Sequence, residues 1–397
     1  MAYQTGRQIE VAYKPETAFG ALPPPQGAKV FRASSGNLSL SIEPIRSNEN
    51  RRDGMTTRGR HGSRSVAGQY TGDLSVGTFD DLIEAGFRGS FQPALAINAA
   101  AMNAATVSVN ANAITASAGS WINAGLRVGD VFNLGAGFAA TNQNRNLRIT
   151  GLTATVITVA ETLTPEAGPI AAFTINRPKK VIQGQVPRSF AIEERELDID
   201  GSEIFKGVRV GSVQINLQQN GMATLTFQFV GQDMEIREGA QSPYFTNPTE
   251  TQTIGMTAVE AKVMLGTTDV IDITSLDLTV NLNAAGQPVV GSILTPDVFT
   301  NNATVEGSMT ALKSDVTRSQ RYLKETQLSL HLLFEEKEDG LRDFCAFSIP
   351  NFTLASATKS DLGSDGARTQ SFSLLVGKDL RGGAYDPTMI SFQTSAA

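Results

Sequence analysis

The sequence predicts a mainly β protein that contains two tandem β-sandwich or barrel units, each with one short helix, and a small inserted all-β domain. Three observations predict this class. Apolar and polar residues alternate along many short segments, as in antiparallel strands with one buried face. Several segments recur in the same order in both halves of the chain. One stretch of the first half, rich in Ala, Asn and Thr, has no counterpart in the second.

The composition is that of a folded protein with more than one core. The chain has 397 residues, of which 41% are hydrophobic and 18% charged. The first residues, MAYQTGRQIEV, lack the layout of a secretory signal, and the apolar run PALAINAAAM is too short to span a bilayer. Cys345 is the only cysteine, so no intrachain disulfide is expected. The net charge of −6 argues against general binding to phosphate backbones.

The repeat defines the domain organisation. Each half has an alternating strand, a long polar segment, and three further matching segments in the same order, which indicates a duplication. The matching pairs are 37–45 with 275–282, 65–89 with 304–325, 188–217 with 328–354, and 222–234 with 367–380. We therefore expect a first unit at 1–96 and 184–248, an inserted small β-barrel or sandwich at 97–183, and a second unit at 249–397.

One short helix is expected in each half. In GTFDDLIEAGF, Thr78 can cap the first turn, and Asp80 and Asp81 favour the positive end of the helix. The apolar face of this helix is formed by Phe79, Leu82, Ile83 and Phe87. The second helix starts at Ser314 or Asp315, and its weaker apolar pattern consists of Val316, Tyr322 and Leu323.

Turn residues and isolated polar residues are best explained by ordinary structural roles. Asn220–Gly221 predicts a β-hairpin, and so does Asp200–Gly201. Asp198, Asp200 and Glu203 could hold calcium in principle, but their spacing departs from that of an EF-hand loop. The glycines of LGAGFAA predict a turn, and Trp121 is expected in the core of the insert, with a carbohydrate platform as the alternative.

Catalytic signatures are missing from the sequence. There is no GxxxxGKS/T, HExxH, GxSxG or CxxC motif, and His61 and His331 are the only histidines. We expect structural roles for both histidines, no enzyme activity, and no cofactor or metal.

The segment RSNENRRDGMTTRGRHGSRS (46–65) concentrates positive charge. It contains no lysine, and its only acids are Glu49 and Asp53. Its arginines are Arg46, Arg51, Arg52, Arg58, Arg60 and Arg64. Arginine forms planar, bidentate pairs with phosphates and with carboxylates alike, so this loop could hold nucleic acid or another copy of the protein. The corresponding loop of the second half, 283–302, has no arginine or lysine, which argues against a general role in contacting DNA.

The chain resembles the tail tube (major tail) proteins of long-tailed bacteriophages. The opening EVAYKPETAFGALPP carries the resemblance, together with SLSIEPIRSNENRRDG, SVAGQYTGDLSVGTFDDLIEAGFRGSF and the closing β-hairpins. It covers roughly 1–95 and 184–245, and the second half looks like a diverged copy of the same unit.

The resemblance implies a virion structural protein of the phage tail, assembled in the host bacterial cytoplasm. Subunits of such proteins combine their inner sheets into a barrel, and the rings stack into a hollow conduit for DNA ejection. A chain with two units implies a homotrimeric ring with pseudo-sixfold symmetry. The implied partners are other copies of the chain and other tail proteins (tail tip, terminator and tape measure). Double-stranded DNA would pass without specific binding, and no membrane is involved.

The resemblance also gives a role to the charged segments. The six arginines of the loop would contact a neighbouring subunit or ring. Two acidic runs occupy equivalent places in the repeats and would either be solvated, face the lumen or meet the arginine loop of a neighbour. They consist of Glu193, Glu194 and Glu196, and of Glu335, Glu336, Glu338 and Asp339. Two other functions remain open: a tail-associated decoration protein or adhesin whose insert contacts the host surface, and an enzyme acting on wall polysaccharide, which lacks a convergent catalytic set.

Overall fold

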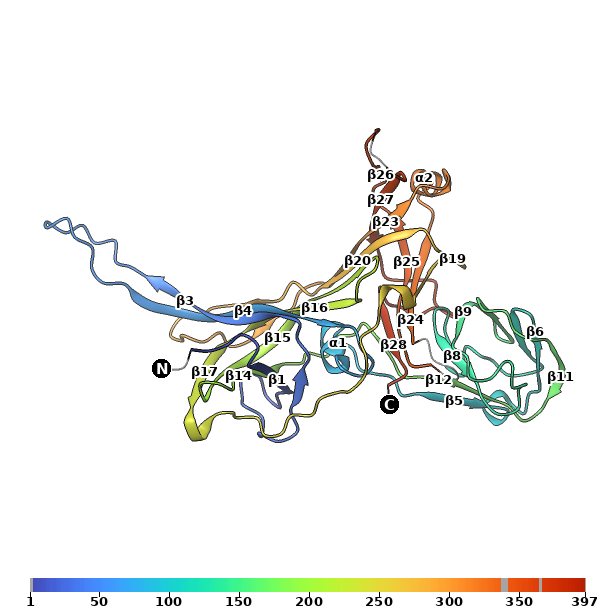
Figure 1. Ribbon diagram of the computed structural model, residues 1–397, viewed down its shortest axis with the longest axis horizontal. Coiled ribbons are helices and arrows are strands. Elements are labelled where there is room, and N and C mark those ends of the chain that lie inside the picture. Colours follow the sequence, from blue (N-terminus) through green and yellow to red (C-terminus); the bar gives the residue numbers. More distant parts are fainter. Residues whose placement is uncertain (1–2, 337–341, 364–365, 397) are drawn as a thin grey trace.

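A computed structural model describes residues 3–336, 342–363 and 366–396. The described chain contains a large 18-stranded sheet, a separate 8-stranded sheet, a two-stranded ribbon and two α-helices. The mainly β class is thus confirmed. Three parts project from the centre: the β3–β4 hairpin, the separate sheet on the opposite side, and the end of the molecule that carries α2 (Figure 1). None of the helices in this part of the chain has the length and apolarity needed to cross a membrane.

The large sheet takes its strands from both halves of the chain. Its first-half elements, with the helix that packs on them, are β1 (Ile9–Pro15), β2 (Lys29–Phe31), β3 (Ser35–Ile45), β4 (Arg60–Asp73), α1 (Asp80–Gly86), β13 (Lys180–Ile182), β14 (Phe190–Glu196), β15 (Gly201–Gln218), β16 (Thr224–Gly231) and β17 (Asp233–Glu238). Its second-half elements, with their helix, are β18 (Ala261–Leu265), β19 (Thr268–Val270), β20 (Ile273–Asn281), β23 (Thr304–Leu312), α2 (Thr317–Leu323), β24 (Leu328–Glu335), β25 (Phe344–Leu354), β26 (Thr358–Lys359), β27 (Thr369–Val376) and β28 (Ser391–Thr394).

The remaining elements lie in the insert and in connections. The separate sheet contains β5 (Leu95–Asn98), β6 (Val107–Asn110), β7 (Ala113–Ala116), β8 (Val131–Leu134), β9 (Leu147–Leu152), β10 (Val156–Val159), β11 (Glu166–Ile170) and β12 (Thr174–Arg177). The ribbon is formed by β21 (Ala285–Gly286) and β22 (Val298–Phe299), and the 3-10 turns are η1 (Ala100–Met102), η2 (Gly239–Gln241) and η3 (Ala258–Glu260).

A continuous run of eight antiparallel strands spans both halves. Its order is β3–β4–β16–β15–β20–β23–β27–β25, and the β15–β20 pair joins the halves. The Asn220–Gly221 turn connects β15 to β16, as predicted, and Asn220 adopts a positive φ of 58°. Alternate residues along each strand point into the core or away from it, which gives this run one apolar and one polar face.

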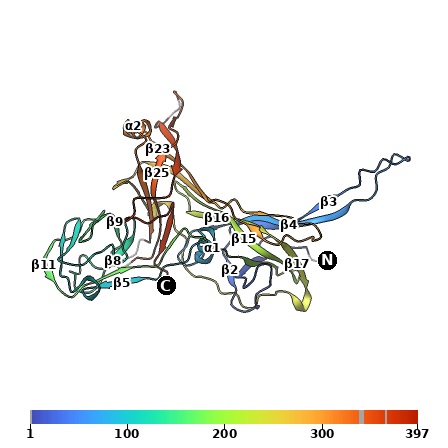
Figure 2. The ribbon, with the colours of Figure 1, turned by 180° about the vertical axis from the view of Figure 1, so that it is seen from behind.

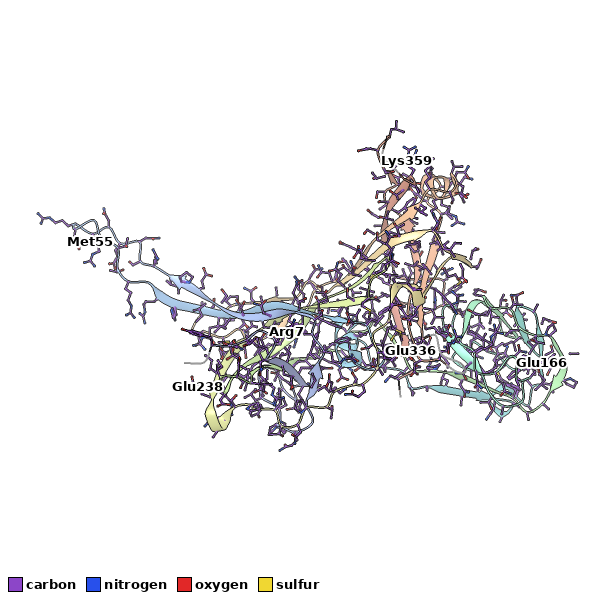
Figure 3. All side chains as sticks on the ribbon, in the orientation of Figure 1. Arg7, Met55, Glu166, Glu238, Glu336 and Lys359 are labelled. Atoms are coloured by element: carbon purple, nitrogen blue, oxygen red, sulfur yellow. The ribbon has the colours of Figure 1, made fainter. Side chains whose placement is uncertain are left out.

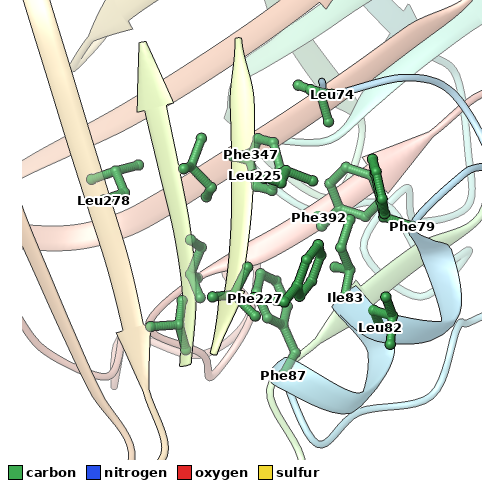
Figure 4. Close-up of a cluster of buried hydrophobic side chains, with 14 of the residues drawn as sticks. Leu74, Phe79, Leu82, Ile83, Phe87, Leu225, Phe227, Leu278, Phe347 and Phe392 are labelled. Carbon is green, nitrogen blue, oxygen red and sulfur yellow. The ribbon is translucent and has the colours of Figure 1, made fainter. Parts of the chain in front are cut away.

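Helix α1 covers the apolar face of the run. Its four predicted apolar residues are all buried, and they pack with Leu225 and Phe227 of β16 (Figure 4). Gly86 permits this close approach, because a Cβ there would lie 2.2 Å from Val213 Cγ2. The predicted cap is wrong: Phe79 is the N-cap residue, and the Thr78 hydroxyl bonds instead to Ser75 and Thr251 at 2.7 and 2.6 Å.

Helix α2 is placed differently from α1. It begins at Thr317, whose N–H donates to Asp315 Oδ1 at 2.8 Å. Val316 and Leu323 are 59% and 80% exposed, so α2 does not pack on the core as α1 does. The weak apolar pattern of its sequence agrees with this outcome, since α2 buries none of its residues.

The insert has its own core, which contains Trp121. This side chain is fully buried, and its Nε1–H donates to Thr155 O at 3.0 Å. Core packing of Trp121 is therefore confirmed, and the carbohydrate platform is wrong because the indole has no exposed face. The strands of the separate sheet run from Leu95 to Arg177, whereas β13, inside the expected range 97–183, pairs with β28 in the large sheet.

Candidate assembly surfaces

The arginine loop is the tip of a projecting arm. Strands β3 and β4 pair from Ser35 opposite Thr71 to Ile45 opposite Arg60, and residues 46–59 connect them beyond the body of the protein (Figure 2). The side chain of Met55 lies at the far end of this arm and is 71% exposed (Figure 3). The arm therefore presents its tip to solvent within one copy of the chain.

The six arginines do not form one cluster. Arg51 pairs with Asp53 inside the tip at 3.2 Å, while Arg64 at the base of the arm pairs with Asp233 of β17 at 2.9 Å. The exposed members are Arg46, Arg51, Arg52, Arg58 and Arg60. Arg64 thus holds the arm on the body, and the other five guanidinium groups are the ones a partner could reach.

The corresponding loop of the second half, residues 283–302, packs back on the protein. Asp297 pairs with Arg209 at 2.7 Å, and Thr295 O accepts a hydrogen bond from Gln232 Nε2 at 2.6 Å. The backbone N–H of Arg64 also donates to Ile293 O at 2.9 Å. One long loop therefore projects, and the other lies along the first half.

The acidic residues Glu193 and Glu335 lie inside the chain. Glu193 is fully buried and accepts hydrogen bonds from the backbone N–H groups of Tyr244 and Phe245 at 2.6 and 2.8 Å. The buried Glu335 carboxylate contacts Lys262 Nζ at 2.6 Å. These two carboxylates therefore bond to groups within the chain.

The other acidic candidates are more accessible. Glu194, on β14, accepts a hydrogen bond from the backbone N–H of Leu38 at 2.9 Å and another from the Tyr70 hydroxyl. Burial and the Glu194 charge raise the pKa of Tyr70, which therefore stays protonated and donates. Glu196 and Glu336 are partly exposed, and Glu338 and Asp339 lie outside the described residues. Burial, with the charges of Glu194 and Glu196, raises the pKa of Glu203.

A further candidate surface is the face of the eight-strand run that points away from the core, here called the polar face. Residues opposite one another in the ladder share a face, so the strand register defines its rows. The rows are Asn37–Gln69–Gln228–Ser212–Asn281–Thr304; Ser35–Thr71–Thr226–Gln214–Thr279–Glu306–Leu375–Thr353; Asp73–Thr224–Asn216–Asp277–Ser308–Ser373; and Gln218–Ser275–Thr310–Ser371–Thr358.

The polar face consists mainly of uncharged hydrogen-bonding side chains. Neighbours bond to one another across strands, as Thr71 does with Thr226 at 2.8 Å. The charged positions in these rows are Asp73, Asp277 and Glu306, and no row contains Lys or Arg. Arg209 lies beyond a bulge in β15 and is held by Asp297. Rows with a few negative charges and no unpaired positive ones offer little attraction to a polyanion.

The remaining candidates are structural. His331 is buried, and its Nε2 lies 3.0 Å from Gly129 O, while burial lowers the pKa of the imidazole to about 3. Asp200, with a positive φ of 49°, lies in the turn between β14 and β15, as its Asp-Gly pair predicts. The sequence reasoning missed the polar face, although its signal is present as Gln214 and Asn216 alternating with apolar residues.

Comparison with known proteins agrees with these features. The family model for the phage tail tube protein matches residues 6–376. A search of curated proteins finds no match. The tail tube family is structural, has no implied catalytic role, and functions by self-assembly with other proteins of the virion tail. Because the match spans nearly the whole chain, this protein belongs to the phage tail tube protein family and is a structural component of the virion tail.

Proposed function

We propose that copies of this chain polymerise into stacked rings, and that the polar face lines the channel through which DNA is ejected. The single observation that carries this proposal is the charge pattern of that face: its four rows are polar and weakly acidic and contain no Lys or Arg, and the neighbouring Arg209 is paired with Asp297. Each neutralised phosphate strengthens DNA binding, so a conduit that lets DNA slide needs such a lining. Closing several copies into one barrel also removes the open sheet edges.

Matching strand registers support two tandem tube units. The β14–β15 ladder has a bulge between Phe190 and Ile192, and the β24–β25 ladder has one between Leu328 and Leu330. The β15–β16 ladder has a further bulge between Val210 and Ser212. The second half has a similar irregularity. Leu354 pairs with Leu374 and Thr358 with Ser371, so four steps along the chain lie opposite three on β27, and one residue after Leu354 is extra. Bulges at corresponding positions are difficult to explain without duplication.

The bulges support a correspondence between residues of β14 and β15 and residues of β24 and β25. Val208 matches Phe352, and Phe190 matches Leu328, because each pair sits at the same bulge. In this correspondence Glu193, three residues before the end of β14, matches His331, four residues before the end of β24. The two acidic runs would then be offset along their strands and would not occupy equivalent places.

The same correspondence supports the proposed domain division and ring symmetry. A first unit at 1–96 and 184–248 and a second at 249–397 give each chain two similar, non-identical edges, as a closed ring with heterologous contacts requires. Three chains would supply a ring of pseudo-sixfold symmetry. The insert would lie outside the barrel, since its sheet is separate from the eight-strand run.

The exposed arginines of the arm would contact a neighbouring ring. Their carboxylate partners would come from the acidic runs of another copy, with the partly exposed Glu196 as the first candidate and Glu336 and Glu338 as further ones. Contacts with tail tip, terminator and tape measure proteins would start and end the tube, and assembly would take place in the host bacterial cytoplasm. DNA would pass without specific contacts.

Negative-stain electron microscopy of the purified full chain tests the proposal. Rings or tubes of uniform bore are expected, if necessary after addition of tail-tip components as initiator. Persistent monomers under both conditions would contradict polymerisation.

A further inference from the structure

The junction between the two halves shows how one unit joins the next. Along one edge, β15 pairs first with β14, from Gly201 to Val208, and then with β20, from Ser212 to Gln218. In the second part, Ser212 lies opposite Asn281, Gln214 opposite Thr279 and Asn216 opposite Asp277. One edge of β15 is thus paired first with a strand of its own unit and then with a strand of the following unit.

The equivalent edge of the second unit is open. Strand β25 pairs with β24 as far as Phe352, and the chain then continues along β27 through Leu354 and Thr358. Within the described residues, no strand pairs with the other edge of residues 354–360. Strand β3, which matches β20, likewise has β4 as its one strand partner in this part of the chain. Among the described residues, the chain therefore has one open edge at β3 and another at residues 354–360. These two edges lie at opposite ends of the eight-strand run.

Glu194 occupies the open edge of β3. The backbone N–H of Leu38 points away from β4 and donates to Glu194 Oε1 at 2.9 Å, and the Tyr70 hydroxyl donates to the same oxygen. The strand correspondence matches Glu194 with Leu332, which is fully buried, and there the edge of β20 is paired with β15. The first unit thus has a carboxylate where the edge of β3 is open, and the second unit has a leucine where the edge of β20 is paired. This difference indicates that Glu194 has a role specific to the open edge.

We propose that Glu194 guards β3 until residues 356–360 of a second copy displace it and pair with β3. This inference rests on the proposed ring-forming function. Transfer of the β15–β20 register puts Ser356 of one copy opposite Ser41 of the next, Thr358 opposite Ser39, and Ser360 opposite Asn37. These Ser, Thr and Asn side chains continue the polar face without interruption across the junction.

Charge complementarity identifies the new partner of Glu194. In the same register Lys359 lies opposite Leu38, on the face where Glu194 meets Tyr70. Lys359 is exposed in the single chain and lies at the end of the molecule far from β3 (Figure 3). When the strands pair, the Leu38 N–H exchanges the carboxylate for a backbone carbonyl, and the released carboxylate meets the incoming ammonium group. The exchange keeps a free chain from pairing its edge indiscriminately.

Cysteine cross-linking in the full chain tests the register. Directly opposite residues in an antiparallel pair have a Cα separation that a disulfide accepts, and the native Cys345 is buried. Under mild oxidation, Ser39→Cys with Thr358→Cys should give covalent rings. The control, Ser35→Cys with Ser356→Cys, is displaced by six residues and should not cross-link. Rings or tubes that form without the Ser39–Thr358 cross-link would overturn this inference and leave the proposed function intact.

Assembly kinetics test the guard. Glu194→Leu copies the residue of the filled junction, so it should shorten the lag of polymerisation several-fold, as followed by light scattering. Lys359→Glu should lengthen the lag, whereas Arg145→Glu on the insert, with the same change in charge, should not. Thermal unfolding of each variant verifies that the subunit is folded. An unchanged lag for folded Glu194→Leu or Lys359→Glu overturns the guard, and failure of the unmodified chain to form rings overturns the proposed function as well.

Discussion

Arg148 of β9 forms a bidentate ion pair with Asp269 of β19, with nitrogen–oxygen distances of 2.6 and 2.8 Å. The Arg148 side chain is 2% exposed and also contacts Glu161 at 2.7 Å. Nearby, the buried Lys180 pairs with Asp130 of the insert and with Asp386 at 2.7 Å. The insert is therefore held against the second half by ion pairs in which the cations, Arg148 and Lys180, are buried.

Replacing Arg148 with methionine should destabilise the protein. The change leaves the Glu161 carboxylate near the insert interface without its cation, and we expect a loss of about 2–3 kcal/mol after allowing for the exposure of Asp269. Chemical denaturation measures this loss. The control Arg52→Met, on the exposed arm, should change the unfolding free energy by less than about 0.5 kcal/mol. Equal changes in unfolding free energy for the two variants would show that the ion pairs of Arg148 do not stabilise the fold.

His331 should make the folded protein sensitive to acid. Its pKa falls from 6.5 to about 3 on burial, so the unfolded chain binds a proton that the folded chain does not. Stability from this group is complete above pH 6.5 and declines as the pH falls toward 3. Buried carboxyls with raised pKa values, such as Asp130, act with the opposite sign. Melting temperatures between pH 7 and 5 should decline less in His331→Leu than in the unmodified chain, and parallel slopes would exclude His331 as the cause.

The arm should act in stacking and not in folding. Arg51→Glu with Arg52→Glu reverses two exposed charges, so the subunit should remain folded while stacking of rings is impaired. Electron microscopy should show separate rings or short tubes. Arg64→Ala is the contrasting variant: it removes the pair with Asp233 at the base of the arm and should lower stability. Normal tubes from the double variant would contradict a role of the arm tip.

Positive charge on the polar face should make the channel retain DNA. Gln214→Lys and Thr279→Lys place two ammonium groups opposite one another in the central row, and repetition around the ring multiplies them. Tubes should still form, but DNA should be ejected more slowly, and the defect should weaken as the salt concentration rises. Gln214→Thr with Thr279→Gln is a neutral control. Ejection at the normal rate by the lysine variant would argue against a luminal polar face.

Local signals predicted much of the fold. The Asn220–Gly221 turn and the apolar face of α1 depend on residues adjacent along the chain, and the structure confirms them. The Thr78 cap failed because Thr251, remote in sequence, takes the hydroxyl. The guarding contact of Glu194 was likewise out of reach, since Leu38 approaches it only through the fold.

The polar face was visible in the sequence but not interpretable there. Gln214 and Asn216 alternate with buried Val213 and Ile215, a pattern that any sheet with one solvated face also shows. Only the register across eight strands reveals that these residues form one surface that lacks Lys and Arg. The acidic runs attracted attention by their charge, yet Glu193 is fully buried.

An electron cryomicroscopy reconstruction of the assembled tube tests the central claim most directly. It should show a closed barrel in which Gln214 and Thr279 face the lumen, with the insert on the outside. A reconstruction in which the polar face lies outside the tube, or between subunits away from any channel, would contradict the account.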